Sequence, residues 1–250
     1  MKRIIIIFTA IMFFGLSAFA QTVSVKQANE LYKKGNYQEA AQQYENIIVN
    51  KGVAPELFYN LGNAYYKSSE IGRSILNYER ALRLYPTYDD ARFNLEMVQL
   101  KVVDNIVQAP TFFLGRWIEN LIKLITSNQW IVISICSFIS GLLFIFIFVF
   151  GSTRQLRKNS FYVGSFLIIM SLFTLVFSGV RKDQLLYHHE AIVMSGVVTV
   201  KSSPDKSGTD LFQLHEGTKV NIKSTLGGWT EIKLGNGNIG WVETPNIEKI

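Results

Sequence analysis

The stretch "WIVISICSFISGLLFIFIFVFGSTRQLRKNSFYVGSFLIIMSLFTLVFSGV", residues 130–180, decides the architecture of this chain. Its two ends, 130–150 and 161–180, contain no charged side chain, and a helix needs about 20 apolar residues to cross the hydrocarbon of a bilayer. Because backbone groups cannot stay unpaired in lipid, both ends are predicted to be helices. One such run is also compatible with a core helix of a soluble domain, but two in tandem predict a transmembrane hairpin.

The short connection between these runs sets their orientation. Residues 151–160 hold Arg154, Arg157 and Lys158 and no acidic residue, and short loops rich in Lys and Arg remain in the cytoplasm. The sequence therefore predicts a cytoplasmic loop at 151–160 in a bacterial inner membrane, with the chain before and after the hairpin on the outer side.

The N-terminus predicts the same orientation independently. Two basic residues precede an apolar run at 4–16, and the small residues Ala18 and Ala20 follow it. This is the pattern of a secretory signal peptide. We expect residues 1–20 to be a signal peptide cleaved after Ala20, with an uncleaved anchor as the alternative. Both ends of the mature chain would then lie in the periplasm.

Composition and charge agree with a membrane protein. The 250 residues are 48% hydrophobic, and 25 Lys and Arg against 19 Asp and Glu give a net charge of +6. The basic excess lies around the hairpin and at the N-terminus, whereas opposite charges nearly balance within 21–104 and 189–250. No nucleic-acid partner is therefore predicted. The single cysteine, Cys136, lies in an apolar run and excludes an intramolecular disulfide.

The segment before the hairpin, "FFLGRWIENLIKLITSN" (112–128), is predicted to be an amphipathic helix. Apolar residues recur at helical spacing on one face, and Glu119 and Lys123 fall on the other. Trp117 suits a membrane–water boundary, so this helix is expected to lie along the outer leaflet in contact with lipid. A helix packed on the preceding domain is the alternative.

The segment 21–104 repeats itself. "YQEAAQQYENII" (37–48) aligns with "IGRSILNYERAL" (71–82), and "FYNLG" (58–62) aligns with "RFNLE" (92–96), each time with a shift of 34 residues. A helical period of 34 is the signature of tetratricopeptide repeats, so this segment resembles that family. We expect copies at 21–54 and 55–88 and a capping helix at 89–104 that ends the all-α solenoid.

The resemblance implies that the first helices of the repeats line a concave, peptide-binding face. Asparagines there can hold a peptide backbone, and lysines can hold carboxylates. The candidate binding residues are Asn29, Tyr32, Lys33, Asn60, Asn63, Tyr66, Lys67, Asn94 and Lys101. Solvated helix residues are the alternative. Asn29 and Asn60 fit the carboxylate-clamp subtype, but Val25 and Asp90 stand where that subtype has lysines, so a C-terminal carboxylate ligand is not predicted.

The segment 190–250 changes to a β pattern. Short alternating runs such as "WTEIKL" and "NIGWVE" are separated by turn clusters such as "LGG" and "GNGN", which predicts about five strands in a small all-β barrel. The order "VKSSPDKSG", "LHEGTKVNI", "GGWTEIKLGNGNIGWV" resembles bacterial SH3 domains. Trp241 is expected in the core and Trp229 at a groove, although both tryptophans in the core is the alternative. The aromatic residues of a polyproline groove are missing.

Catalytic motifs are missing from the sequence. The histidines are His188, His189 and His215, and adjacent histidines point apart, so no metal site, cofactor or enzyme activity is expected.

The order of segments, from signal peptide through repeats and hairpin to SH3-like barrel, resembles the BatE family of the Bacteroides aerotolerance operon. The resemblance implies an adaptor that works with von Willebrand-type membrane proteins and an AAA-type ATPase in stress tolerance. Two functions remain open: a scaffold that binds proteins or peptides through its repeats, and a cell-wall protein that binds peptidoglycan through its SH3-like domain.

Overall fold

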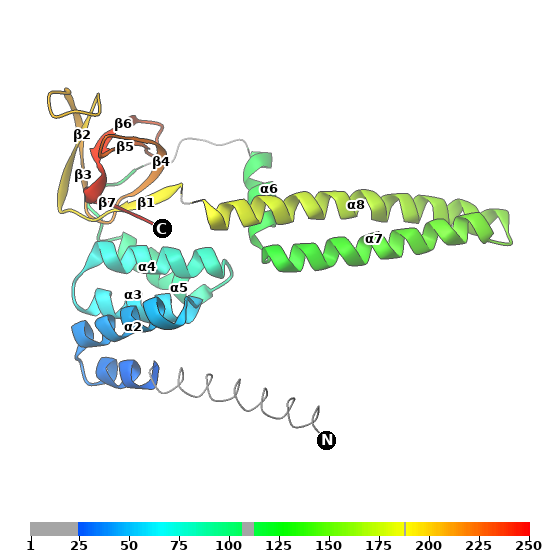
Figure 1. Ribbon diagram of the computed structural model, residues 1–250, viewed down its shortest axis with the longest axis horizontal. Helices are drawn as coiled ribbons and strands as arrows, with labels where there is room; N and C mark the ends of the chain where they lie inside the picture. The colour runs from blue at the N-terminus through cyan, green and yellow to red at the C-terminus, as the bar shows by residue number, and fades with distance from the viewer. Residues whose placement is uncertain (1–24, 107–112, 188) are drawn as a thin grey trace, which may run out of the picture. The chain divides into compact units, whose positions relative to one another are not determined.

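The computed structural model describes residues 25–106, 113–187 and 189–250, and it divides the chain into two compact units. One unit contains the helical repeats together with the C-terminal sheet, and the other, within 110–188, contains the apolar hairpin (Figure 1). The predicted signal peptide, 1–20, lies outside the described residues.

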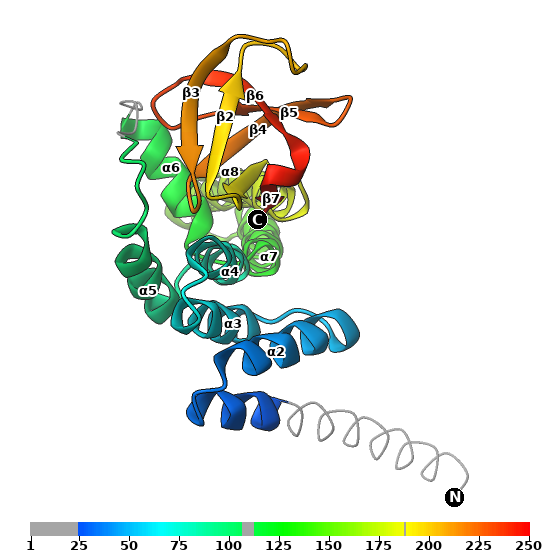
Figure 2. The ribbon, with the colours of Figure 1, turned by 90° about the vertical axis from the view of Figure 1, so that its left-hand side faces the viewer.

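The N-terminal part of the first unit is a stack of helices in chain order (Figures 1 and 2). A helix over 25–33 is followed by α2 (Tyr37–Lys51), α3 (Pro55–Lys67), α4 (Ile71–Leu84) and α5 (Asp89–Gln99). This agrees with the predicted helical repeats.

Small residues set how closely the paired helices approach. A Cβ at Gly62 would lie 2.8 Å from the Tyr78 ring, and the Ser74 hydroxyl donates to the Gly62 carbonyl at 2.9 Å. Any larger side chain at position 62 would push α3 and α4 apart, which explains why the repeat needs glycine here.

The C-terminal part is one antiparallel sheet with the order β3-β2-β6-β5-β4-β1-β7. Its strands are β1 (Glu190–Val193), β2 (Val197–Lys201), β3 (Asp210–His215), β4 (Lys219–Leu226), β5 (Trp229–Lys233), β6 (Ile239–Glu243) and β7 (Ile247–Lys249). Val193, Val200, Val220, Ile232 and Val242 are buried in its core. The sheet has more strands than the sequence predicted, because β1 and β7 pair with each other as an added edge.

The prediction that Trp241 lies in the core is wrong. Strand residues alternate between faces, and the buried neighbours are Gly240 and Val242, so Trp241 points to the opposite, half-exposed face. A Cβ at Gly240 would lie 2.4 Å from Val200, which leaves no room for a bulky side chain on the inner face. Trp229 is also half-buried, on β5 opposite Glu243.

The second unit contains α6 (Phe113–Lys123), α7 (Ser127–Phe150) and α8 (Arg154–Leu186). Among the described residues, α7 and α8 are long and apolar enough to cross a membrane, a statement of length and composition alone. They run side by side (Figure 1).

The predicted loop at 151–160 is shorter than expected. Helix α8 begins at Arg154, after Thr153, whose side chain accepts a hydrogen bond from the Leu156 backbone N–H. Because this cap starts the helix early, Arg157 and Lys158 occupy its first turns rather than a loop.

Small residues seven positions apart hold the hairpin together. Ser127, Ser134 and Gly141 on α7 face Ser178, Ser171 and Gly164 on α8. The Ser127 and Ser178 hydroxyls each donate to the other residue's carbonyl at 3.0 Å, and Ser134 donates to the Ser171 carbonyl at 2.9 Å. Close approach through small and hydroxyl residues is typical of helices that pack within a bilayer.

Helix α6 is amphipathic, as its sequence indicates. Phe113 and Trp117 are exposed, whereas Ile122 is buried and its carbonyl accepts from the Trp130 indole N–H at 3.0 Å. On the polar side, Lys123 pairs with Glu119 at 2.6 Å. Whether the exposed apolar face meets lipid stays a prediction.

Candidate functional site

A pocket of about 200 Å³ opens on the face formed by the first helices of the repeats. It lies between the helix at 25–33 and α3. Its lining residues are Asn29, Tyr32, Lys33, Tyr44, Asn60 and Asn63. Five of these six residues, all except Tyr44, belong to the predicted binding set. Two segments about thirty residues apart thus bring three of the four predicted asparagines, a tyrosine and a lysine to one place.

Asn29 and Asn63, which recur at the repeat period, are held by tyrosines that recur at the same period. The Tyr44 hydroxyl donates to Asn29 Oδ1 at 2.5 Å, and the Tyr78 hydroxyl donates to Asn63 Oδ1 at 2.6 Å. Burial, with Tyr32 nearby, raises the pKa of Tyr44 to about 12, so its hydroxyl stays protonated at neutral pH. Each pair therefore fixes an asparagine on the pocket side of the array.

This arrangement makes the pocket rich in hydrogen-bond donors. Oδ1 of Asn63 accepts from both Tyr78 and Asn94, and Oδ1 of Asn29 accepts from Tyr44. The Nδ2 groups of Asn29 and Asn63 therefore remain as donors for a ligand. Asn60 makes no side-chain hydrogen bond among the described residues, and the exposed Lys33 adds a positive charge at the rim. Such a site suits a ligand rich in carbonyl or carboxylate oxygens.

The remaining predicted residues lie outside this pocket. Asn94 Nδ2 donates to Asn63 Oδ1 at 2.8 Å, and Lys101 Nζ lies 4.5 Å from the centre of the Tyr66 ring. Lys67 is exposed. Asn94, Tyr66 and Lys101 thus contribute to packing between successive first helices.

Sequence reasoning missed Tyr44 as a pocket residue. Its side chain is 1% exposed. The available signal was that Tyr44 and Tyr78 recur at the same 34-residue shift as Asn29 and Asn63, which is a pattern expected of hydrogen-bonded partners.

The sequence also did not indicate that the sheet packs on the repeats. Ile192 of β1 and Ile250 share a buried cluster with Ile75, Leu95 and Val98 of the helices. Sheet and repeats therefore have a continuous core where they meet.

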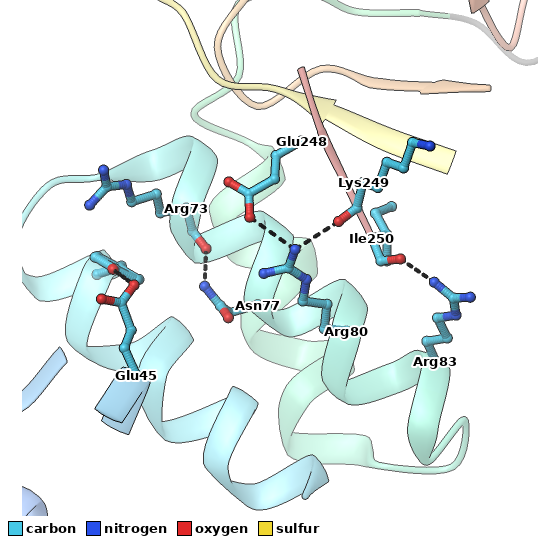
Figure 3. A network of polar contacts seen from close by, with 9 residues as sticks. Glu45, Arg73, Asn77, Arg80, Arg83, Glu248, Lys249 and Ile250 are labelled. Atoms are coloured by element: carbon cyan, nitrogen blue, oxygen red, sulfur yellow. Dashed lines mark hydrogen bonds and ion pairs between the residues drawn. The ribbon is translucent and has the colours of Figure 1, made fainter. Parts of the chain in front are cut away.

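Polar contacts surround this junction (Figure 3). Arg80 donates to Glu248 Oε1 at 2.9 Å and to the Lys249 carbonyl at 2.8 Å, and Arg83 donates to the Ile250 carbonyl. Both arginines come from α4, so this helix holds the C-terminal edge of the sheet.

Asp104, after α5, makes the densest set of junction contacts. It accepts from the His215 backbone N–H at 2.7 Å and from the Thr218 hydroxyl at 2.6 Å, and its other oxygen lies 2.7 Å from His215 Nδ1. Burial opposes ionisation of Asp104, but the hydrogen bonds from Thr218 and His215 outweigh it and lower the pKa of the carboxyl.

Lys219 adds an ion-pair network beside Asp104. Its Nζ lies 3.0 Å from Glu79 Oε2 and 3.1 Å from Glu190 Oε2. Burial alone would lower the pKa of Lys219, but Glu79 and Glu190 outweigh that effect and raise it.

The predicted groove residue Trp229 follows the turn at Gly227 and Gly228, both of which have positive φ. Its half-buried ring lies on the same face as Glu231 and Trp241, which are opposite each other in the ladder. This face carries no metal-ligating cluster, nor does any other region within the described residues.

The chain therefore combines paired helices that carry a donor-lined pocket with one antiparallel sheet. Two family models match it: "Tetratricopeptide repeat" at residues 55–88 and "Bacterial SH3 domain" at residues 196–248. Each covers less than half of the chain, so they identify domains within it.

Solved structures show only remote similarity. One, titled "Crystal structure of MamA", is 18% identical, with 66% of this chain and 79% of that chain covered and a TM-score of 0.32. A second, "Crystal structure of MamA protein", is 17% identical, with 66% and 74% covered and a TM-score of 0.30. No curated protein matches the chain.

Proposed function

We propose that this protein is a membrane-anchored adaptor that captures a partner protein through the pocket on its repeat face. The observation that carries the proposal is the meeting of Asn29, Tyr32, Lys33, Asn60 and Asn63 in one pocket. We propose no catalytic step, because the pocket offers donors and a charge but no nucleophile paired with a base.

The partner segment is expected to be extended and to carry an acidic residue. Amide Nδ2 groups of Asn29 and Asn63 are placed to donate to peptide carbonyls, and Lys33 at the rim is placed to pair with a carboxylate. A pocket of about 200 Å³ accommodates a few side chains rather than a folded domain.

Membrane attachment and orientation are further parts of the proposal. The apolar helices α7 and α8 support two spans, and the basic residues where they join support a cytoplasmic turn, with repeats and sheet in the periplasm. The resemblance to the BatE family supports von Willebrand-type membrane proteins as partners and a role in aerotolerance.

A second function rests on a different observation. Trp229 and Trp241 are both half-exposed on one face of a domain that matches the bacterial SH3 model. Aromatic rings beside Glu231 are suited to stack on sugars and to hydrogen-bond hydroxyl groups, so peptidoglycan is the alternative ligand.

Affinity capture from cells separates the two functions. The test variant combines Lys33→Ala with Asn60→Ala, and Lys34→Ala is the control, since Lys34 is exposed at the end of the same helix. The adaptor proposal predicts that partner recovery, measured by mass spectrometry, falls with the double variant only. Recovery that is unchanged, together with binding to purified cell wall that Trp229→Ala abolishes, would favour the alternative.

A further inference from the structure

Helix α5 leaves an apolar stripe uncovered. Phe93 is 64%, Met97 49% and Leu100 80% exposed, and Val103 just beyond the helix is 72% exposed. The opposite side of α5 is buried through Ala91, Leu95 and Val98. Terminal repeats of a solenoid ordinarily present a polar outer face, so this stripe requires an explanation.

The repeat period shows what kind of element the stripe fits. Tyr59 and Tyr66 precede Phe93 and Leu100 by one repeat. They are covered by α5 and the turn after it: Asn94 lies 3.4 Å from the Tyr59 hydroxyl, and Lys101 lies over the Tyr66 ring. Phe93 and Leu100 therefore occupy the positions on α5 against which another helix would stack.

The spacing of the stripe indicates a helical partner. Phe93, Met97 and Leu100 follow one another at steps of four and three residues, which is the seam spacing of helices that pack with interlocking side chains. Along the helix, Phe93 and Leu100 lie at nearly equal distances on either side of Met97.

The charges beside the stripe fit a second copy of α5 in antiparallel orientation. Asp90 in the first turn and Lys101, two residues beyond the end of α5, are both exposed. They lie eleven residues apart, close to three full helical turns, so helical spacing continued to Lys101 puts them on one flank, where Lys101 Nζ lies 4.5 Å from the centre of the Tyr66 ring. An antiparallel pair related by a two-fold axis would bring Asp90 of each copy opposite Lys101 of the other.

We propose that two copies of this chain associate through α5, with Met97 near the two-fold axis. Head-to-tail stacking is disfavoured, because the described start of the array presents the exposed polar residues Lys26, Gln27 and Glu30 and offers no matching apolar stripe. The proposal does not depend on a ligand in the Asn29–Asn63 pocket.

Disulfide trapping tests this association in the full-length protein reconstituted in lipid nanodiscs or held in detergent. With Cys136→Ser as background, Met97→Cys should give a covalent dimer on mild oxidation. Gln99→Cys is the control, because Gln99 is exposed on a different side of the same helix. No dimer from position 97, or equal yield from position 99, overturns the proposal.

Charge exchange gives a second readout that a loss of folding cannot imitate. Asp90→Lys and Lys101→Asp should each weaken dimerisation by a factor of about two to five, and the double exchange should restore it. Phe93→Ser with Leu100→Ser should give a monomer with unchanged helicity. A chain that is monomeric throughout, or one whose stripe binds a different protein, contradicts the proposal.

Discussion

Replacing Asp104 by alanine should loosen the junction between the repeats and the sheet. The change leaves the His215 N–H, the His215 ring and the Thr218 hydroxyl without their acceptor. The Asp104 side chain is 14% exposed, so water can replace part of the lost hydrogen bonding. We expect the free energy of unfolding to fall by roughly 2–4 kcal/mol, because three charge-assisted hydrogen bonds share one carboxylate. Asn105→Ala, at the exposed neighbouring residue, should change stability by less than about 0.5 kcal/mol.

Hydrogen exchange of the full-length protein in detergent would measure this loss. Amides of β1 and of the 215–219 turn should lose protection by a factor of about 30 or more for 2 kcal/mol, whereas amides in α2 should change little. Exchange in the 215–219 turn that matches the Asn105→Ala control would refute the assignment of Asp104 as the main polar contact of the junction.

The same variant has a predicted pH dependence. The pKa of Asp104 is lowered in the folded protein, so its contribution is fully present above the ordinary value of 3.8 and is lost as the pH falls through the folded value. Protection of the wild-type junction should therefore fall in that acidic range, and the difference between wild type and Asp104→Ala should shrink there. A difference that persists unchanged well below pH 3.8 would contradict the predicted sign.

Three further predictions concern other contacts. Gly217→Ala should destabilise the junction by about 1–3 kcal/mol in thermal unfolding. Gly217 has φ +87°, and an added Cβ would lie 2.9 Å from Ile75 and from Val102. An unchanged melting temperature would contradict this prediction. Gly141→Leu should separate α7 from α8 and expose the hairpin to protease in detergent, since its Cβ would lie 3.2 Å from the Gly164 carbonyl. The control Leu142→Ala, at an exposed position, should leave the protease sensitivity unchanged. Alkaline phosphatase should be active when fused after Lys101 or Ile250 and inactive when fused after Ser152; activity at Ser152 would reverse the topology.

The spacing of apolar residues predicted the helices and strands well where each of them packs one face against the element that follows it in the chain. The 34-residue period is set by paired helices, so it located the repeats and brought most of the pocket residues together. Periodicity could not tell a pocket asparagine from a packing one, because Asn60 and Asn94 recur at the same 34-residue shift although Asn60 lines the pocket and Asn94 donates to Asn63.

Other features depend on contacts that the local sequence does not record. Trp241 was assigned to the wrong face, because Gly240 and Val242, and not Trp241 between them, lie on the side of β6 that faces the core. Residues 154–160 were predicted as loop from their charge, although the Thr153 cap makes them helical. The junction joins Asp104 to a turn more than a hundred residues later, a distance that no periodicity spans.

The most direct test of the adaptor proposal is photo-crosslinking from the pocket in living cells. A photoreactive amino acid at position 33, on the pocket rim, should give an adduct with one partner protein, and the same amino acid at position 42, on the exposed side of α2 away from the pocket lining, should not. Asn60→Ala in the same chain should reduce the adduct from position 33. Absence of an adduct at position 33, or an equal yield from position 42, would contradict the claim that this pocket binds the partner.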